Sequence, residues 1–247
     1  MIEKLKDRYN ILAAFFVFFI AVIIFQLVNL QIIDGKSYDE KSQRKLIRED
    51  IVIAPRGNIV DTNGVPIAVN RLGFTVQMIR TGLKESQLNE MILRLVNTFE
   101  ENNDTYYKSL KRYMTINPID YGSAIKNSQS AIEKWKREMI LKEKDLEIME
   151  TPEEIFEYFK KHKFNIDDSY TDEEAYKIMA IRYEMLIRGY STLNPLVVAK
   201  DVSKKTVAVI EEKWDEFPGV ITGIEPMRKY IDADNMAHVV GRVGLID

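Results

Sequence analysis

The sequence predicts an α+β protein in which one membrane helix precedes a body made of a small β-containing base and a mostly helical insertion. Three observations predict this fold class. An uncharged apolar segment lies near the N-terminus, apolar and polar residues alternate on both sides of the centre of the chain, and helix-capping patterns cluster between them. A length of 247 residues suits one or two domains with a substantial core.

Residues 11–30 are the predicted membrane helix. The segment ILAAFFVFFIAVIIFQLVNL has no charged residue, and a helix of this length spans about 30 Å, the hydrocarbon thickness of a bilayer. A cleavable signal peptide would have a shorter apolar region and a small-residue cleavage site. Gln26 and Asn29 are its strongly polar residues. They are candidate contacts with a partner helix, although interfacial positions near the outer end of the span explain them equally well.

The composition limits the compartment and the partners. Residues 1–10 carry three basic residues against two acidic ones, so the positive-inside rule predicts a cytoplasmic tail and an extracytoplasmic body. The net charge of -3 excludes the basic surface that nucleic-acid binding requires. The chain has no cysteine, which excludes disulfides, thiol nucleophiles and thiolate metal sites.

The segment IVIAPRGNIVDTNGVPIA, residues 51–68, predicts a β-hairpin. Apolar residues stand on both sides of Asn63-Gly64, the dipeptide that best tolerates the positive φ angles of a tight turn. Arg56 and Asp61 flank the turn at a spacing that a salt bridge could close. Residues 74–78 then alternate between apolar and polar, as in a half-buried strand.

Residues 81–190 are predicted to form the helical insertion, or head. Apolar residues between Leu88 and Phe99 recur at the spacing of one helix face. Thr151 with Glu154 and Thr171 with Glu174 are capping boxes that begin two more helices. The second of these helices is expected to stop at Gly189.

Residues 191–247 complete the base, together with residues 31–80. A short strand at residues 196–199 leads into a helix capped by Ser203, with Val207, Ile210 and Trp214 expected on one apolar face. Phe217-Pro218-Gly219 ends that helix, and residues 220–231 are again extended.

We expect no catalytic, metal or cofactor site in residues 1–247. The histidines are His162 and His238, without metal-ligand spacing, and no glycine-rich phosphate loop occurs. Two S-x-x-K patterns begin at Ser42 and Ser123, but the S-x-N and K-[ST]-G elements of penicillin-recognising enzymes are missing. Acidic pairs lack an apolar pocket. His238 fits a structural hydrogen-bonding role better than a catalytic one.

Four motifs resemble the N-terminal half of the class B penicillin-binding proteins, most closely the elongation type. LQIIDGKSY is similar to the family's L-Q-x-x-x-G-x-x-Y, and RGNIVDTNG to R-G-x-I-x-D-R-N-G. FPGVITGIEPMRKY resembles a P-G-V segment followed by R-x-Y, and AHVVGRVG resembles A-H-x-x-G-x-x-G. Thr62 replaces an arginine, and Ile231 stands where proline is common. The motifs cover residues 30–80 and about 194–244, and no match is claimed in the head.

This resemblance implies a noncatalytic, elongated pedestal that lifts a C-terminal D,D-transpeptidase domain, absent from residues 1–247, off a bacterial cell membrane. The parent enzyme acts by serine acyl transfer on the peptide stems of peptidoglycan, in cell-wall synthesis and cell shape. The implied partners are a polytopic SEDS-type glycosyltransferase, other cell-envelope proteins and a second copy. Residues of the joint between pedestal and enzyme would be Arg56, Gly57, Asp61, Asn63, Gly64, Arg228, Tyr230, His238 and Gly241.

Two other interpretations remain open: a stand-alone bitopic scaffold of the elongation or division machinery, and an extracytoplasmic sensor domain. A sensor would normally have a second span or a cytoplasmic output domain, for which the ten residues before Ile11 leave no room. A scaffold would be expected to end in a terminal cap or polar tail, and the segment before Asp247 has neither.

Overall fold

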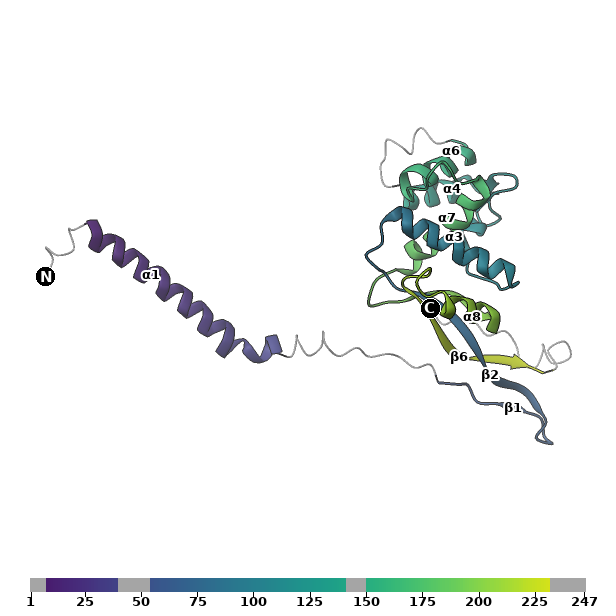
Figure 1. Cartoon of the computed structure of the whole chain (residues 1–247), viewed down its shortest axis with the longest axis horizontal. Helices are drawn as coiled ribbons and strands as arrows, with labels where there is room; N and C mark the ends of the chain where they lie inside the picture. Colours follow the sequence, from purple (N-terminus) through teal and green to yellow (C-terminus); the bar gives the residue numbers. More distant parts are fainter. Residues whose placement is uncertain (1–7, 40–53, 141–149, 232–247) are drawn as a thin grey trace. The chain divides into compact units, whose positions relative to one another are not determined.

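The computed structural model describes residues 8–39, 54–140 and 150–231, and the chain forms two compact units, residues 1–52 and 53–247. The first unit contains helix α1 (Arg8–Val28), which continues into the π-helix η2 (Asn29–Ile33) (Figure 1). Within it, Asn10–Ile32 is apolar and long enough to cross a membrane, with a mean hydropathy of 3.0. The predicted span is therefore confirmed as a candidate membrane helix.

The second unit is built on a four-stranded antiparallel sheet whose central strand is β2. Strand β6 pairs with β2 in an unbroken register from Ala68 opposite Tyr230 to Met78 opposite Val220. Strands β1 and β5 share the other edge of β2, β1 near its start and β5 near its end. The strands are β1 (Ile59–Val60), β2 (Pro66–Met78), β5 (Leu196–Val202) and β6 (Val220–Tyr230).

Most of the helices lie in the chain between β2 and β5. Figure 1 shows α3, α4, α6 and α7 grouped together, with α8 beside the sheet. Helix α3 packs against α7, and α8 contacts β2 and β6. In chain order the elements are α3 (Glu85–Glu101), η3 (Ser109–Arg112), β3 (Met114–Thr115), β4 (Asp120–Tyr121), α4 (Gln129–Met139), α6 (Pro152–Tyr158), η4 (Phe159–Lys163), α7 (Asp172–Arg188) and α8 (Lys204–Glu212).

One apolar core joins the sheet to these helices. The expected face of α3 from Leu88 to Phe99 is buried in it, together with Val76 and Met78 of β2. Trp135, in this core, stacks on the partly buried Tyr113 with ring centroids 5.7 Å apart. The α+β class is therefore confirmed. The division into a base and a head stays a prediction, since the described residues of both share this core.

The local signals for helix ends agree with the structure. Thr151 and Thr171 each accept a hydrogen bond from the backbone of the glutamate three residues later, and the glutamate bonds back, which completes both capping boxes. Helix α7 ends before Gly189, which has φ +79°. One expectation was wrong: Trp214 follows the end of α8 and is 75% exposed, so it does not extend the apolar face of that helix.

Candidate functional site

Asp61 orders the turn between β1 and β2. Its backbone N–H donates to the carbonyl of Val65 at 2.9 Å, and its own carbonyl accepts from Gly64 at 3.1 Å. Its carboxylate oxygen Oδ1 accepts two further bonds, from the backbone N–H of Asn63 at 2.8 Å and of Val65 at 2.7 Å. Aspartate favours turns because its short side chain can satisfy the backbone in this way.

The turn differs from the expected one, in which both Asn63 and Gly64 would have positive φ angles. Gly64 has φ +80°, whereas Asn63 is not in the left-handed region. The bond from Gly64 to Asp61 spans three residues, and the register shifts between Ile59 and Val60. These features describe a type I turn followed by a glycine bulge, in which only the bulge residue needs a positive φ. The glycine is therefore required at this position, and the asparagine is not.

The chain that enters this hairpin is bonded to the sheet by two side chains. Asn70 of β2 and Arg228 of β6 lie opposite each other in the register. The amide Nδ2 of Asn70 donates to the carbonyl of Arg56, and Nη1 of Arg228 donates to the carbonyl of Gly57 at 2.7 Å. Two strands far apart in sequence thus hold residues 56–57 through their backbone, and these four residues form what we call the joint.

The joint contains three of the residues that the sequence singled out, in roles that differ in part from those expected. Arg56 takes part through its carbonyl, and the ion pairs of the described residues do not include one between Arg56 and Asp61. Arg228 contributes a polar contact to Gly57 within this chain, and its role at a joint with an enzyme domain stays a prediction. Asn70 was missed, because a single asparagine within a strand carries no signal that its amide reaches a distant backbone carbonyl.

The remaining candidates take no part in the hydrogen bonds of the joint or lie outside the described residues. Tyr230 lies opposite Ala68 and is 37% exposed. His238 and Gly241 belong to the range 232–247, outside the described residues. Gln26 is an exposed residue of α1, and Asn29 begins η2, where its carbonyl accepts from the N–H of Asp34 at 2.9 Å. Their contact with a partner helix stays a prediction.

Replacing Asp61 with alanine is expected to weaken the turn by about 1 kcal/mol, because two backbone donors lose their acceptor at an exposed site. Hydrogen exchange of the Val65 amide should accelerate several-fold. Thr62→Ala, at the adjacent exposed position, is the control and should change this rate little. Equal acceleration in both variants would show that the Asp61 carboxylate does not order the turn.

A second polar cluster is built around two residues of α7, Glu184 and Arg188. The side chain of Glu184 is fully buried, and its Oε1 accepts from the backbone N–H of Ser109 at 2.5 Å. Its Oε2 lies 2.7 Å from Nε of Arg188, whose guanidinium stacks 4.1 Å from the ring centre of Tyr107. The backbone N–H of Tyr107 donates to Val198 of β5 at 2.8 Å. The cluster therefore connects α7, η3 and the sheet.

The sheet face opposite to the core carries ion pairs. Nζ of Lys200 in β5 reaches over β2 to Oε2 of Glu225 in β6 at 2.9 Å. Arg71 of β2 pairs with Asp201 through two contacts, and its hydrogen bond and charge lower the pKa of Asp201. Both side chains of the Arg71–Asp201 pair are exposed, and such pairs contribute little to stability.

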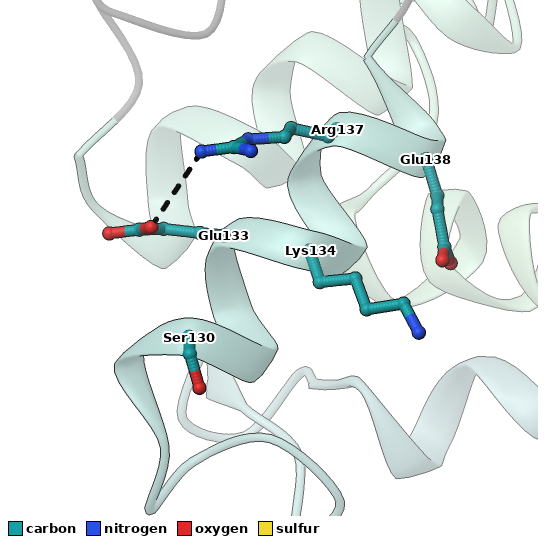
Figure 2. Close-up of a pocket in the computed structure, with 5 residues that line it drawn as sticks. All are labelled: Ser130, Glu133, Lys134, Arg137 and Glu138. Carbon is teal, nitrogen blue, oxygen red and sulfur yellow. Dashed lines mark ion pairs between the residues drawn. The ribbon is translucent and has the colours of Figure 1, made fainter.

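The serine patterns do not form a nucleophilic site among the described residues. Ser123 is exposed in a turn, and the ammonium of Lys126 pairs with Asp120. Ser42 lies outside the described residues. Figure 2 shows a hollow on α4 lined by Ser130, Glu133, Lys134, Arg137 and Glu138. All five are exposed, and Glu133 and Arg137 form a loose ion pair at 4.0 Å, so the hollow is a solvated helix face.

Comparison with known proteins identifies a family match over most of the chain. The family model described as the penicillin-binding protein dimerisation domain matches residues 51–247. Among curated proteins, penicillin-binding protein 2A of Bacillus subtilis (strain 168) is 25% identical over 245 residues, which covers 98% of this chain and 32% of that protein. The chain thus spans about a third of the length of this relative.

Two solved structures are also similar over part of their length. Penicillin-binding protein 2B of Streptococcus pneumoniae (strain 5204) is 19% identical, with 78% of this chain and 28% of that chain covered and a TM-score of 0.43. The same protein from strain R6 is 21% identical, with 76% and 27% covered and a TM-score of 0.33.

Proposed function

The chain belongs to the penicillin-binding protein dimerisation domain family, and from this premise we propose that it is a noncatalytic, membrane-anchored pedestal. In this proposal it positions a peptidoglycan D,D-transpeptidase domain that follows residue 247 in the native gene product. The substrates of that domain are the peptide stems of peptidoglycan, and its work serves cell-wall synthesis and cell shape. No catalytic step is assigned to residues 1–247.

The joint is the observation that carries the proposal. A pedestal must hold a distant domain at a fixed position, and this requires that the chain be bonded rigidly where it enters the sheet. Asn70 and Arg228 bond residues 56–57 to two adjacent strands, and Asp61 fixes the turn that follows. Hydrogen bonds that share one network constrain the backbone more than isolated bonds do.

The proposed anchoring and partners follow from the same premise. The predicted span at residues 11–30, within the candidate helix segment Asn10–Ile32, would place residues 1–10 in the cytoplasm and the sheet-containing unit outside a bacterial membrane. Gln26 and Asn29 would contact a SEDS-type polytopic glycosyltransferase within the bilayer. A second copy of the chain and other cell-envelope proteins would bind the extracytoplasmic unit.

The pedestal role is tested by labelling membranes with a fluorescent penicillin. The native gene product should give a labelled band well above 28.8 kDa, and residues 1–247 expressed alone should stay dark. A dark native protein near 28.8 kDa would favour the stand-alone scaffold, and a labelled fragment would place a nucleophile in residues 1–247.

Positioning is separated from catalysis by variants of the joint in the native gene product. Arg228→Ala combined with Asn70→Ala should leave penicillin labelling intact and reduce the ability to restore cell shape in a depleted strain. Lys229→Ala, an exposed neighbour on the opposite sheet face, is the matched control. Full restoration of shape by the joint variant would contradict the role of the joint in positioning.

A further inference from the structure

Asn63 and Gly64 form the one Asn-Gly pair in the sequence, and both residues are exposed in the turn between β1 and β2. Figure 1 shows this turn at the end of the hairpin, away from the grouped helices. Among the described residues, the side-chain amide of Asn63 has no hydrogen-bond partner. Gly64 has no Cβ that could shield its backbone nitrogen. The pair therefore has the chemical groups that spontaneous deamidation requires.

Deamidation of such a pair needs no enzyme and consumes one water molecule. The backbone nitrogen of Gly64 attacks Cγ of Asn63, and the bond between Cγ and Nδ2 breaks. The proton of the attacking nitrogen ends on the leaving group, which departs as ammonia. Water then opens the five-membered succinimide at one of its two carbonyls. Opening gives either aspartate, with the original chain path, or isoaspartate, in which the backbone runs through the side chain.

The folded turn opposes this reaction, because three consecutive backbone N–H groups donate to Asp61. Those of Asn63 and Val65 bond to its Oδ1 at 2.8 and 2.7 Å. That of Gly64 bonds to its carbonyl at 3.1 Å. These bonds fix the backbone on both sides of the asparagine and hold the proton on the nitrogen that must attack. The nearby carboxylate also disfavours a further negative charge on that nitrogen.

We propose that Asn63 is a deamidation site whose reaction rate is set by opening of the turn that Asp61 orders. The reactive form is the turn with these three bonds broken, so the rate follows the equilibrium population of that open form. The positive φ of Gly64 requires glycine after the asparagine, so the bonds, and not the choice of that residue, suppress the reaction. The proposal does not depend on the pedestal role.

Isoaspartate at residue 63 would remove the turn that protects the asparagine. It lengthens the backbone between Asp61 and Gly64 by one methylene group and adds a carboxylate beside that of Asp61. The N–H groups of residues 64 and 65 can then no longer both reach Asp61 as they do in the turn. Hydrogen exchange of the Val65 amide should therefore be faster in the isoaspartate form than in the unreacted chain.

Ageing of the folded chain in detergent at neutral pH tests the proposal. The wild type, Asp61→Ala and Thr62→Ala are digested at low pH after incubation. Mass spectrometry of the peptide that contains residue 63, with its aspartate and isoaspartate forms separated by chromatography, measures the reaction. Asp61→Ala should deamidate about fivefold faster than the wild type, because a turn weakened by about 1 kcal/mol is open about fivefold more often. Thr62→Ala is the matched control and should react at the wild-type rate.

Two references separate the effect of the turn from that of the local sequence. The same three chains unfolded in urea should react at similar rates, all faster than the folded wild type. Asn127, which is exposed and followed by Ser128, should react at the same rate in all three folded chains.

Three results would overturn the proposal. A folded wild type that reacts as fast as the unfolded chain, or equal rates in folded Asp61→Ala and Thr62→Ala, would show that the turn does not control the reaction. Aspartate as the sole product would exclude attack by the Gly64 nitrogen. An unreactive Asn63 in urea would show that this residue is not a deamidation site.

Discussion

Replacing Arg188 with alanine is expected to lower the free energy of unfolding of the sheet-containing unit by about 3 kcal/mol. The carboxylate of Glu184 is fully buried, and Arg188 supplies the positive charge 2.7 Å from its Oε2. Among the described residues Oε2 has no hydrogen bond, so the ion pair is its main compensation. Loss of the guanidinium also removes the stacking on Tyr107.

Unfolding in urea, followed by tryptophan fluorescence of the chain in detergent, measures this loss. The chain has two tryptophans, and Trp135 is buried in the core while Trp214 is exposed, so the signal reports on the core. Arg137→Ala is the matched control, because Arg137 also follows its partner Glu133 by four residues (Figure 2). Both side chains of that pair are exposed, and its loss should cost less than about 0.5 kcal/mol.

Arg188→Ala has two effects, which are an unpaired buried charge on Glu184 and the loss of packing on Tyr107. A Glu184→Gln background separates them, because it removes the charge. Glutamine can still accept the bond from Ser109 and carries no charge to compensate. Arg188→Ala should therefore be less destabilising there, by about half or more. An equal loss in both backgrounds would show that the stacking on Tyr107, and not the ion pair, accounts for the effect.

The elements that the sequence predicted are those encoded by neighbouring residues. The face of α3 from Leu88 to Phe99, the caps at Thr151 and Thr171 and the end of α7 at Gly189 all depend on spacings within a few turns of the chain. The family resemblance read from the motifs is also confirmed, by the match over residues 51–247.

The contacts that build the joint and the core were not predictable in the same way. Asn70 bonds to a carbonyl 14 residues away, Arg228 to one 171 residues away, and Glu184 to a backbone N–H 75 residues away. Each is a side chain that satisfies a backbone group or a charge brought near only by the tertiary fold. A glutamate on a helix with many apolar residues gives no sign that it is buried.

Gly122 is a further residue whose importance depends on the tertiary fold, and Gly122→Ala is expected to destabilise the chain by about 3 kcal/mol. A Cβ at this position would lie 2.4 Å from both the carbonyl carbon and oxygen of Arg112, and 2.6 Å from the backbone nitrogen of Tyr113. These are backbone atoms at the end of η3, which cannot rotate away as a side chain could. The N–H of Gly122 also donates to Tyr113 at 2.8 Å, so separating the two segments would break this bond.

The urea titration used for Arg188 also measures this effect, because Tyr113 stacks on Trp135 and a displaced backbone would alter the fluorescence of the native state. Gly82→Ala is the control: a Cβ there would meet nothing within 4 Å, and its φ is not in the left-handed region. That variant should be neutral or slightly stabilising, since alanine reduces the conformational freedom of the unfolded chain. If Gly122→Ala were equally neutral, the contact between Gly122 and residues 112–113 would not constrain this part of the core. If only Gly122→Ala caused a large loss in the free energy of unfolding, helix packing would not be enough to hold residues 109–126 against α4 and α7. The close approach of the backbone at Gly122 to residues 112–113 would then be required as well.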